Sequence, residues 1–130
     1  MQKKKPILLY CADRNMLAVT AFALRLQPYE VVAVYNGKEA TALAGDKDSE
    51  FSCGVLIHSQ RGDPAGRLVH NILESASRIP LLLVDHPGDL APVRYADMVL
   101  YGRNTSMAHI LAALEVLCRR KPGPHPRSVA

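Results

Sequence analysis

The sequence lacks several features that would mark a specialised class of protein. It has no Trp and only two Phe among its 130 residues, so an apolar core must be mainly aliphatic. No apolar run approaches the roughly 20 residues that a membrane-spanning helix needs. The basic start, Lys3-Lys4-Lys5, is followed by strand-like sequence without a cleavage signal. We therefore expect a cytoplasmic protein with no membrane segment.

Cysteine is scarce, and the common cofactor motifs are missing. Cys11, Cys53 and Cys118 are an odd number and lie far apart, which excludes the framework of a disulfide-rich secreted domain. No C-x-x-C or H-x-x-x-H spacing favours a metal. Neither of the glycine-rich phosphate-binding motifs nor a G-x-S-x-G elbow occurs. We therefore expect no cofactor, no metal and no enzyme activity.

Acidic residues are absent from both ends of the chain. Seven of the 16 basic residues lie in the ends, at Lys3–Lys5, Arg119–Lys121 and Arg127, whereas all 12 acidic residues lie between Pro6 and Cys118. The net charge of +4 therefore belongs to the tails, and the body is mildly acidic. Nucleic-acid binding needs clustered Lys and Arg on a folded face, and no segment supplies them. The pattern does not favour a nucleic-acid partner.

The remaining composition is that of one globular domain. Apolar residues make up 48% of the chain and charged residues 22%, which suffices for an ordinary core. We expect a basic N-terminal tail at residues 1–5, a domain at residues 6–120, and a disordered, proline-rich tail at residues 121–130.

Strand and helix patterns alternate along this domain. Short apolar runs predict strands at 7–11, 29–35, 53–57, 79–84 and 98–101. Helical spacing predicts helices at about 16–26, from Asn36-Gly37 through Leu43, after Asp63-Pro64, and after Thr105 or Ser106. Only His86 to Tyr95 separates the last two strands, and its prolines and glycine leave room for a turn or two of helix. The order predicts an α/β fold: a single doubly wound, five-stranded parallel sheet with helices on both faces.

The order and several short stretches resemble the receiver domain of two-component response regulators, which has a flavodoxin-like fold. The likeness covers about Lys5 to Arg120. Its best stretch is residues 29–40, YEVVAVYNGKEA, which is similar to the receiver's second strand, turn and helix start. Gly66 opening a helix, Ile79-Pro80 and Ala96-Asp97 also match. The short link before the fifth strand departs from the family, whose fourth helix would here be short or absent.

The resemblance implies five functional positions, and each is changed in this chain. The family's acidic pair falls at Cys11 and Ala12, with Asp13 one place beyond. The phosphoacceptor Asp falls at His58, because the family's loop glycine follows it by eight residues and Gly66 does so here. The hydroxyl position falls at Asp85, and the Lys position falls at Gly102, next to Arg103.

These changes remove the family's chemistry. Mg²⁺ prefers carboxylate oxygens, and this set offers at most Asp13 and Asp85. Aspartyl phosphate cannot form without the Asp. The resemblance therefore predicts a degenerate pseudo-receiver: a signalling module that acts without phosphorylation, by binding a protein partner that the sequence does not name or a second copy of itself.

One alternative of another class remains open. Ligands bind at the carboxyl edge of such sheets, where the sequence places Cys11, His58, Asp85 and His86. Cys and His side chains suit Zn²⁺, and a Cys–His pair can support nucleophilic chemistry. The alternative is a small-molecule or metal-binding protein, or an enzyme, that uses a pocket around His58.

Overall fold

A computed structural model describes residues 5–27, 29–46, 51–60, 65–74, 79–88, 96–102 and 105–118. The described residues form five strands and four helices. The elements are β1 (Lys5–Cys11), α1 (Arg14–Arg25), β2 (Tyr29–Val34), α2 (Gly37–Gly45), β3 (Cys53–His58), α3 (Ala65–Glu74), β4 (Leu81–Asp85), β5 (Met98–Tyr101) and α4 (Met107–Cys118).

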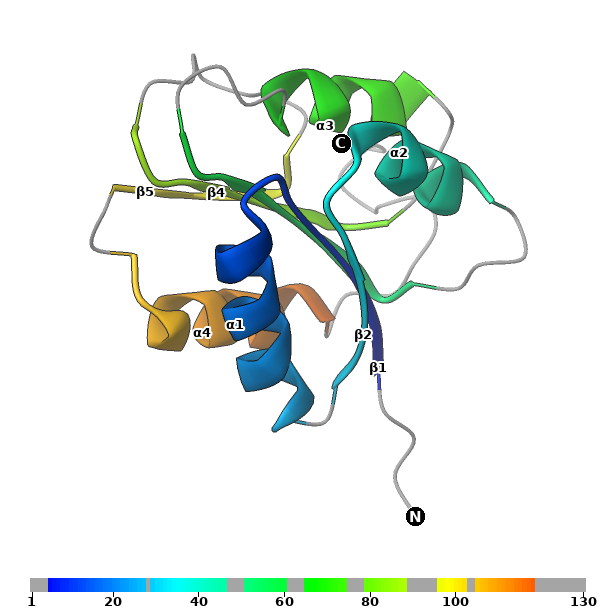
Figure 1. Cartoon of the computed structure of the whole chain (residues 1–130). Coiled ribbons are helices and arrows are strands. Elements are labelled where there is room, and N and C mark those ends of the chain that lie inside the picture. Colours follow the sequence, from blue (N-terminus) through cyan, green and yellow to red (C-terminus); the bar gives the residue numbers. More distant parts are fainter. Residues whose placement is uncertain are drawn as a thin grey trace, which may run out of the picture.

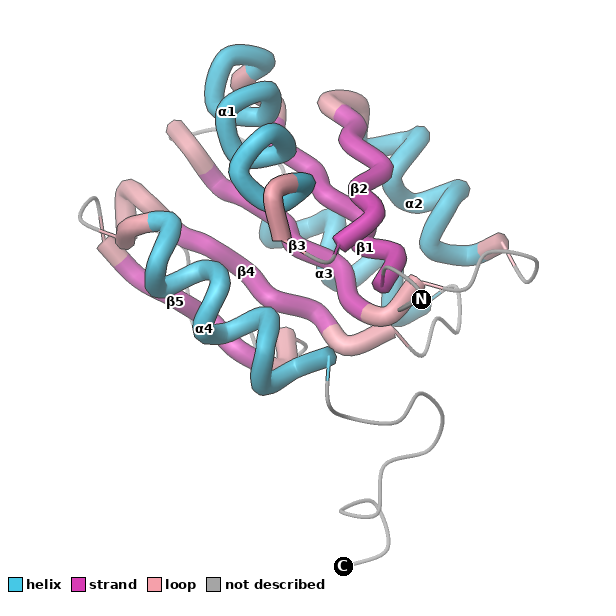
Figure 2. The backbone as a smooth tube through the Cα atoms, turned by 90° about the horizontal axis from the view of Figure 1, so that it is seen from below, coloured by secondary structure: helices cyan, strands magenta, loops and turns pink. Residues whose placement is uncertain are grey.

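The five strands form one parallel sheet in the order β2-β1-β3-β4-β5, which confirms the predicted fold class. Figure 1 shows α2 and α3 on one face of this sheet and α1 and α4 on the other. Figure 2, seen from below, places α1 and α4 side by side in front of the strands. The order changes direction at β1, so the chain winds toward one sheet edge first and then toward the other.

Two apolar layers hold the helices to the sheet. On the α1/α4 face, Leu9, Ile57 and Val84 belong to one buried cluster. On the α2/α3 face, Leu8, Leu56 and Leu83 belong to a second one. Because successive strand residues point to opposite faces, the central strands need apolar residues at every position. All residues of β3 and β4 are buried, as the continuous apolar run in β4 predicts.

The strand boundaries differ from the predictions at β4. The apolar run predicts a strand from Ile79, but β4 begins at Leu81. Pro80 has no N–H group with which to extend the ladder, although its carbonyl oxygen still accepts a hydrogen bond from the Gly54 amide at 2.8 Å. The third strand is one residue longer than predicted, because His58 pairs with Asp85.

The helices lie where the sequence predicts them and bury apolar residues. In α3, Leu68, Val69 and Ile72 are buried, and Asp63 and Pro64, after which this helix is predicted, lie outside the described residues. The first helix begins at Arg14, two residues earlier than predicted, and Asp13 is its N-cap. In α4 the buried residues are Ile110, Ala113, Leu114 and Leu117.

The link between β4 and β5 is only partly described. Residues 86–88 and 96–97, which flank the strands, contain no helix, and residues 89–95 lie outside the described ranges. The expected tails also lie largely outside them, because nothing is described before residue 5 or after residue 118. No helix among the described residues is long and apolar enough to cross a bilayer.

Candidate functional site

Three of the predicted site residues end neighbouring strands. Cys11, His58 and Asp85 are the last residues of β1, β3 and β4, and each is at most 1% exposed. His58 and Asp85 are register partners, while Cys11 pairs with Ile57, one residue short of His58. The sheet therefore brings the three backbones to one edge, as the sequence predicts, but it leaves their side chains little access to solvent.

The side chains at this edge do not all face the same way. Cys11 packs in the α1/α4 cluster together with Ile57. His58 lies two residues after Leu56, whose side chain belongs to the α2/α3 cluster, and strand alternation directs His58 to that same face. Strand alternation thus places the side chains of Cys11 and His58 on opposite faces of the sheet, which argues against a cooperating Cys–His pair.

Asp85 serves the backbone of the turn that follows it. Its Oδ1 accepts a hydrogen bond from the Gly88 amide at 3.0 Å, and Gly88 has a φ of 70°. A positive φ favours glycine, so the Asp85 carboxylate and Gly88 together define this turn. The Asp85 carbonyl oxygen also accepts from the Gly102 amide at 2.9 Å.

The position of the family's Lys carries a second glycine with unusual geometry. Gly102 follows β5 and has a φ of 101°, which side chains with a Cβ rarely adopt. The backbone conformation thus accounts for glycine at this position. The neighbouring Arg103 lies outside the described residues.

Next to the acidic-pair positions stands one carboxylate, that of Asp13, which takes part in the start of α1. Ala12 is exposed and Asp13 is half-buried. The Asp13 carboxylate accepts a hydrogen bond from the Met16 amide at 3.1 Å and so caps α1. The Asp13 carboxylate therefore stabilises the start of α1, next to the positions where the resemblance places metal ligands.

The metal and small-molecule alternative gains no support from this edge. Among the described residues, no group of three or more His, Cys, Asp or Glu side chains could hold a metal ion. His58 is 1% exposed, and its Nδ1 makes no hydrogen bond to the described residues, although the side chain has other interactions. His86 is half-buried, and its amide donates to the His58 carbonyl oxygen at 3.1 Å.

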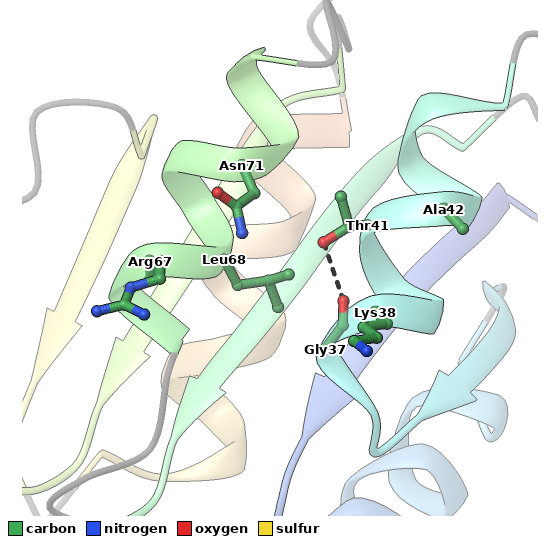
Figure 3. A pocket seen from close by; sticks show the side chains of 7 residues that line it. All are labelled: Gly37, Lys38, Thr41, Ala42, Arg67, Leu68 and Asn71. Atoms are coloured by element: carbon green, nitrogen blue, oxygen red, sulfur yellow. Dashed lines mark hydrogen bonds between the residues drawn. The ribbon is translucent and has the colours of Figure 1, made fainter.

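A cavity of about 390 Å³ lies elsewhere, between α2 and α3. Its lining residues are Gly37, Lys38, Thr41, Ala42, Arg67, Leu68 and Asn71, none of which is a predicted site residue. Figure 3 shows the Thr41 hydroxyl donating to the Gly37 carbonyl oxygen, at 2.9 Å, and the Arg67 side chain pointing away from α2. The pocket predicted around His58 is thus not where this cavity lies.

The outer face of α1 carries exposed apolar residues that the sequence-based predictions do not include. Val19, Phe22 and Leu26 are 68%, 66% and 70% exposed. They follow one another at spacings of three and four, so they form one stripe along α1 and the residue that caps its end. The buried residues of α1, among them Leu17 and Leu24, form the opposite face. The sequence of α1 thus contains two sets of apolar residues with helical spacing, one on the buried face and one on the exposed face.

The comparisons with known proteins give matches to structures only. No family model matches this chain, and no curated protein matches it. A CheY-like receiver domain from Methanospirillum hungatei matches with a TM-score of 0.73 and 16% identity, over 90% of this chain and 95% of that one. Receiver domains from other organisms match at similar levels.

Two further matches carry other descriptions. A structure described as adenylate cyclase from Rhodopirellula baltica has a TM-score of 0.75 and 20% identity, over 89% of this chain and 88% of that one. A streptococcal structure, described as one of a family of redox sensors evolved from two-component response regulators, has a TM-score of 0.70 and 21% identity, over 88% of this chain and 51% of that one. At such low identity the likeness establishes the fold, and this chain has the fold of the response regulator receiver domain.

Proposed function

We propose that this chain is a receiver-like signalling module that works without phosphorylation and binds a protein partner through the outer face of α1. The observation that carries the proposal is the stripe of Val19, Phe22 and Leu26, three large apolar side chains that are each about two-thirds exposed. Single exposed apolar residues are ordinary, but three on one face of a helix are typical of an interaction surface.

Charge around the stripe favours a particular partner chemistry. Helix α1 has no Asp or Glu, and it carries Arg14 at its start and Arg25 at its end. Arg14 stacks over the Tyr35 ring at 4.1 Å, and Arg25 donates to the Val31 carbonyl oxygen at 3.1 Å, so both cations have defined positions. A second copy would bring to this surface the same helix, which has no acidic residue and carries its own Arg14 and Arg25. Repulsion there favours, over a homodimer, an amphipathic partner helix with acidic residues beside its apolar stripe.

The strand ends support the proposed independence from phosphorylation. At the phosphoacceptor position stands His58, which cannot form an aspartyl phosphate. The two carboxylates near it, Asp13 and Asp85, accept hydrogen bonds from backbone amides. A divalent metal needs carboxylate oxygens, and the two carboxylates here already accept hydrogen bonds from the backbone.

The partner is tested by affinity capture from the native cell with three forms of the chain. We expect the wild type and Val116→Asp to retain the same partner, and Phe22→Asp to lose it at least tenfold. Val116 is the control because it is an apolar residue of α4 that is 48% exposed and does not belong to the stripe. Equal capture by Phe22→Asp would rule out the α1 face, and light scattering that shows a dimer dependent on Phe22 would replace the acidic partner with a second copy.

Phosphorylation independence needs a separate measurement. The purified chain is titrated with beryllofluoride and Mg²⁺, and its melting temperature and amide NMR shifts are followed. We expect no saturable change around His58. A saturable, Mg²⁺-dependent shift would show that the edge still binds a phosphoryl mimic, and the proposal of an input other than phosphorylation would fail.

A further inference from the structure

Two of the three cysteines meet at the amino end of the sheet, opposite the receiver edge. Cys53 is the first residue of β3 and Cys118 is the last residue of α4. A hydrogen bond joins their side chains, and Cys118 packs against the same apolar cluster that contains Cys53. Helix α4 lies across β3, β4 and β5, so the contact joins the last helix to the centre of the sheet.

The third cysteine is too far away to take part. In the β1–β3 register, Cys53 pairs with Ile7, whereas Cys11 pairs with Ile57. Four residues along a strand span about 13 Å, roughly twice the Cα separation that a disulfide tolerates. The chain therefore has one thiol pair and one isolated thiol, and the isolated one is buried at the other end of β1.

The two paired thiols differ in their access to solvent. Cys53 is fully buried, whereas Cys118 is half-buried and lies at the end of its helix. The hydrogen bond with Cys118, followed by burial, raises the pKa of the Cys53 thiol far above its ordinary value. Because the thiolate is the reactive form, the partly exposed Cys118 is the thiol that meets an oxidant first.

We propose that Cys53 and Cys118 form a reversible intramolecular disulfide when the chain meets a peroxide, and that this bond fastens the end of α4 to β3. The inference goes beyond the proposed function, because it needs neither the α1 stripe nor a partner. It rests on the contact between two side chains that are 65 positions apart in the sequence.

The reaction balances with hydrogen peroxide as the oxidant. The Cys118 sulfur attacks one peroxide oxygen, the O–O bond breaks, and the leaving hydroxide takes up the Cys118 proton as water, which leaves a sulfenic acid. The Cys53 sulfur then attacks the Cys118 sulfur, the S–O bond breaks, and the hydroxide leaves as water with the Cys53 proton. Two thiols lose two electrons and two protons in total, and one peroxide becomes two waters.

The bond would alter the stability of the last helix. It closes a loop that contains α3, β4 and β5, and a long closed loop restricts the unfolded chain strongly. The oxidised form should therefore melt at a higher temperature, by roughly 5–10 °C for a domain of this size. It should also hold the C-terminal turn of α4 against the sheet, where hydrogen exchange reports local opening.

The experiment compares the full-length chain before and after treatment with hydrogen peroxide. We expect the intact mass to fall by two hydrogens, peptide mapping to recover a Cys53–Cys118 link, and dithiothreitol to reverse both the mass change and the rise in melting temperature. A link that involves Cys11, a disulfide between chains, or oxygen addition without the loss of hydrogens would overturn the proposal.

Variants separate this role from simple packing. Cys118→Ser, at the half-buried position, should fold, should not lose two hydrogens, and should show no peroxide-dependent rise in melting temperature. Cys11→Ala removes the isolated thiol and should retain both responses. If Cys118→Ser still gains thermal stability on oxidation, the disulfide is not the cause and the inference is wrong.

Discussion

The two ends of the parallel sheet differ in what their side chains are used for. At the carboxyl end, Asp13 and Asp85 accept hydrogen bonds from backbone amides, and Cys11 and His58 lie on opposite faces. At the amino end, the thiols of Cys53 and Cys118 contact each other. Ligands commonly bind at the carboxyl end of the strands in such folds. Whether a site exists there still depends on which side chains stand at that end. In this chain the groups able to react with one another lie at the other end.

The largest loss in the free energy of unfolding is expected from Asp85→Ala at the carboxyl end of the sheet. The variant removes the acceptor of the Gly88 amide and leaves a gap at a fully buried position. We expect the free energy of unfolding to fall by about 2 kcal/mol in urea titrations, because a hydrogen bond to a charged group is lost.

Asp85→Asn is the matched control for this prediction. It keeps a side-chain oxygen within reach of Gly88 and should cost about 1 kcal/mol or less. Wild-type stability for Asp85→Ala would show that Asp85 does not serve the turn. The carboxylate would then again be a candidate for ligand binding.

A smaller loss in the free energy of unfolding is expected from Gly54→Ala, next to Cys53 at the amino end of the sheet. A Cβ at Gly54 would lie 2.9 Å from the Leu81 Cδ2, which is closer than real contacts allow. We expect a loss of about 1–2 kcal/mol in the free energy of unfolding, since the buried Leu81 side chain must shift.

Gly37→Ala provides the comparison for Gly54. A Cβ at Gly37 meets no atom within 4 Å, and alanine favours a helix more than glycine does. We expect Gly37→Ala to be neutral or slightly stabilising in the same urea titration. Equal losses at the two glycines would mean that tight packing of β3 against β4 is not what requires Gly54.

Most of the fold could be predicted from the sequence because its signals are local. The apolar run at β4 and the spacing of Leu68, Val69 and Ile72 in α3 each follow from burial of one or two faces. The Asp13 cap is equally local. The start of β4 differs from the prediction because the apolar run continues through Pro80, which has no N–H donor for the ladder.

The site was less predictable because it depends on register and on contacts distant in sequence. The sequence places Cys11 and His58 at one sheet edge, but their faces follow from where each strand ends relative to its neighbour. The contact between Cys53 and Cys118 has no local signal at all. By contrast, the stripe of Val19, Phe22 and Leu26 has a helical period and could have been identified from the sequence.

The smallest expected effect on the free energy of unfolding appears at alkaline pH and comes from residues at the amino end of the sheet. Burial, followed by the nearby Cys118 and Glu115, raises the pKa of Tyr29 above its ordinary value of 10.0. Above pH 10 the unfolded chain therefore releases this proton while the folded chain keeps it. Since the folded state then binds more protons, the free energy of unfolding must fall as the pH rises through this range.

The Cys53 thiol contributes with the same sign from lower pH, because its pKa is also raised, from an ordinary value of 9.0. We expect Cys53→Ala to make the alkaline loss of stability shallower from about pH 9, and Tyr29→Phe to do so only from about pH 10, each by at most one proton. Urea titrations between pH 7 and 11 measure both slopes. A Tyr29→Phe slope equal to that of the wild type would show that Tyr29 ionises as readily in the folded chain as in the unfolded one, and that the amino end is less shielded from water than its burial implies.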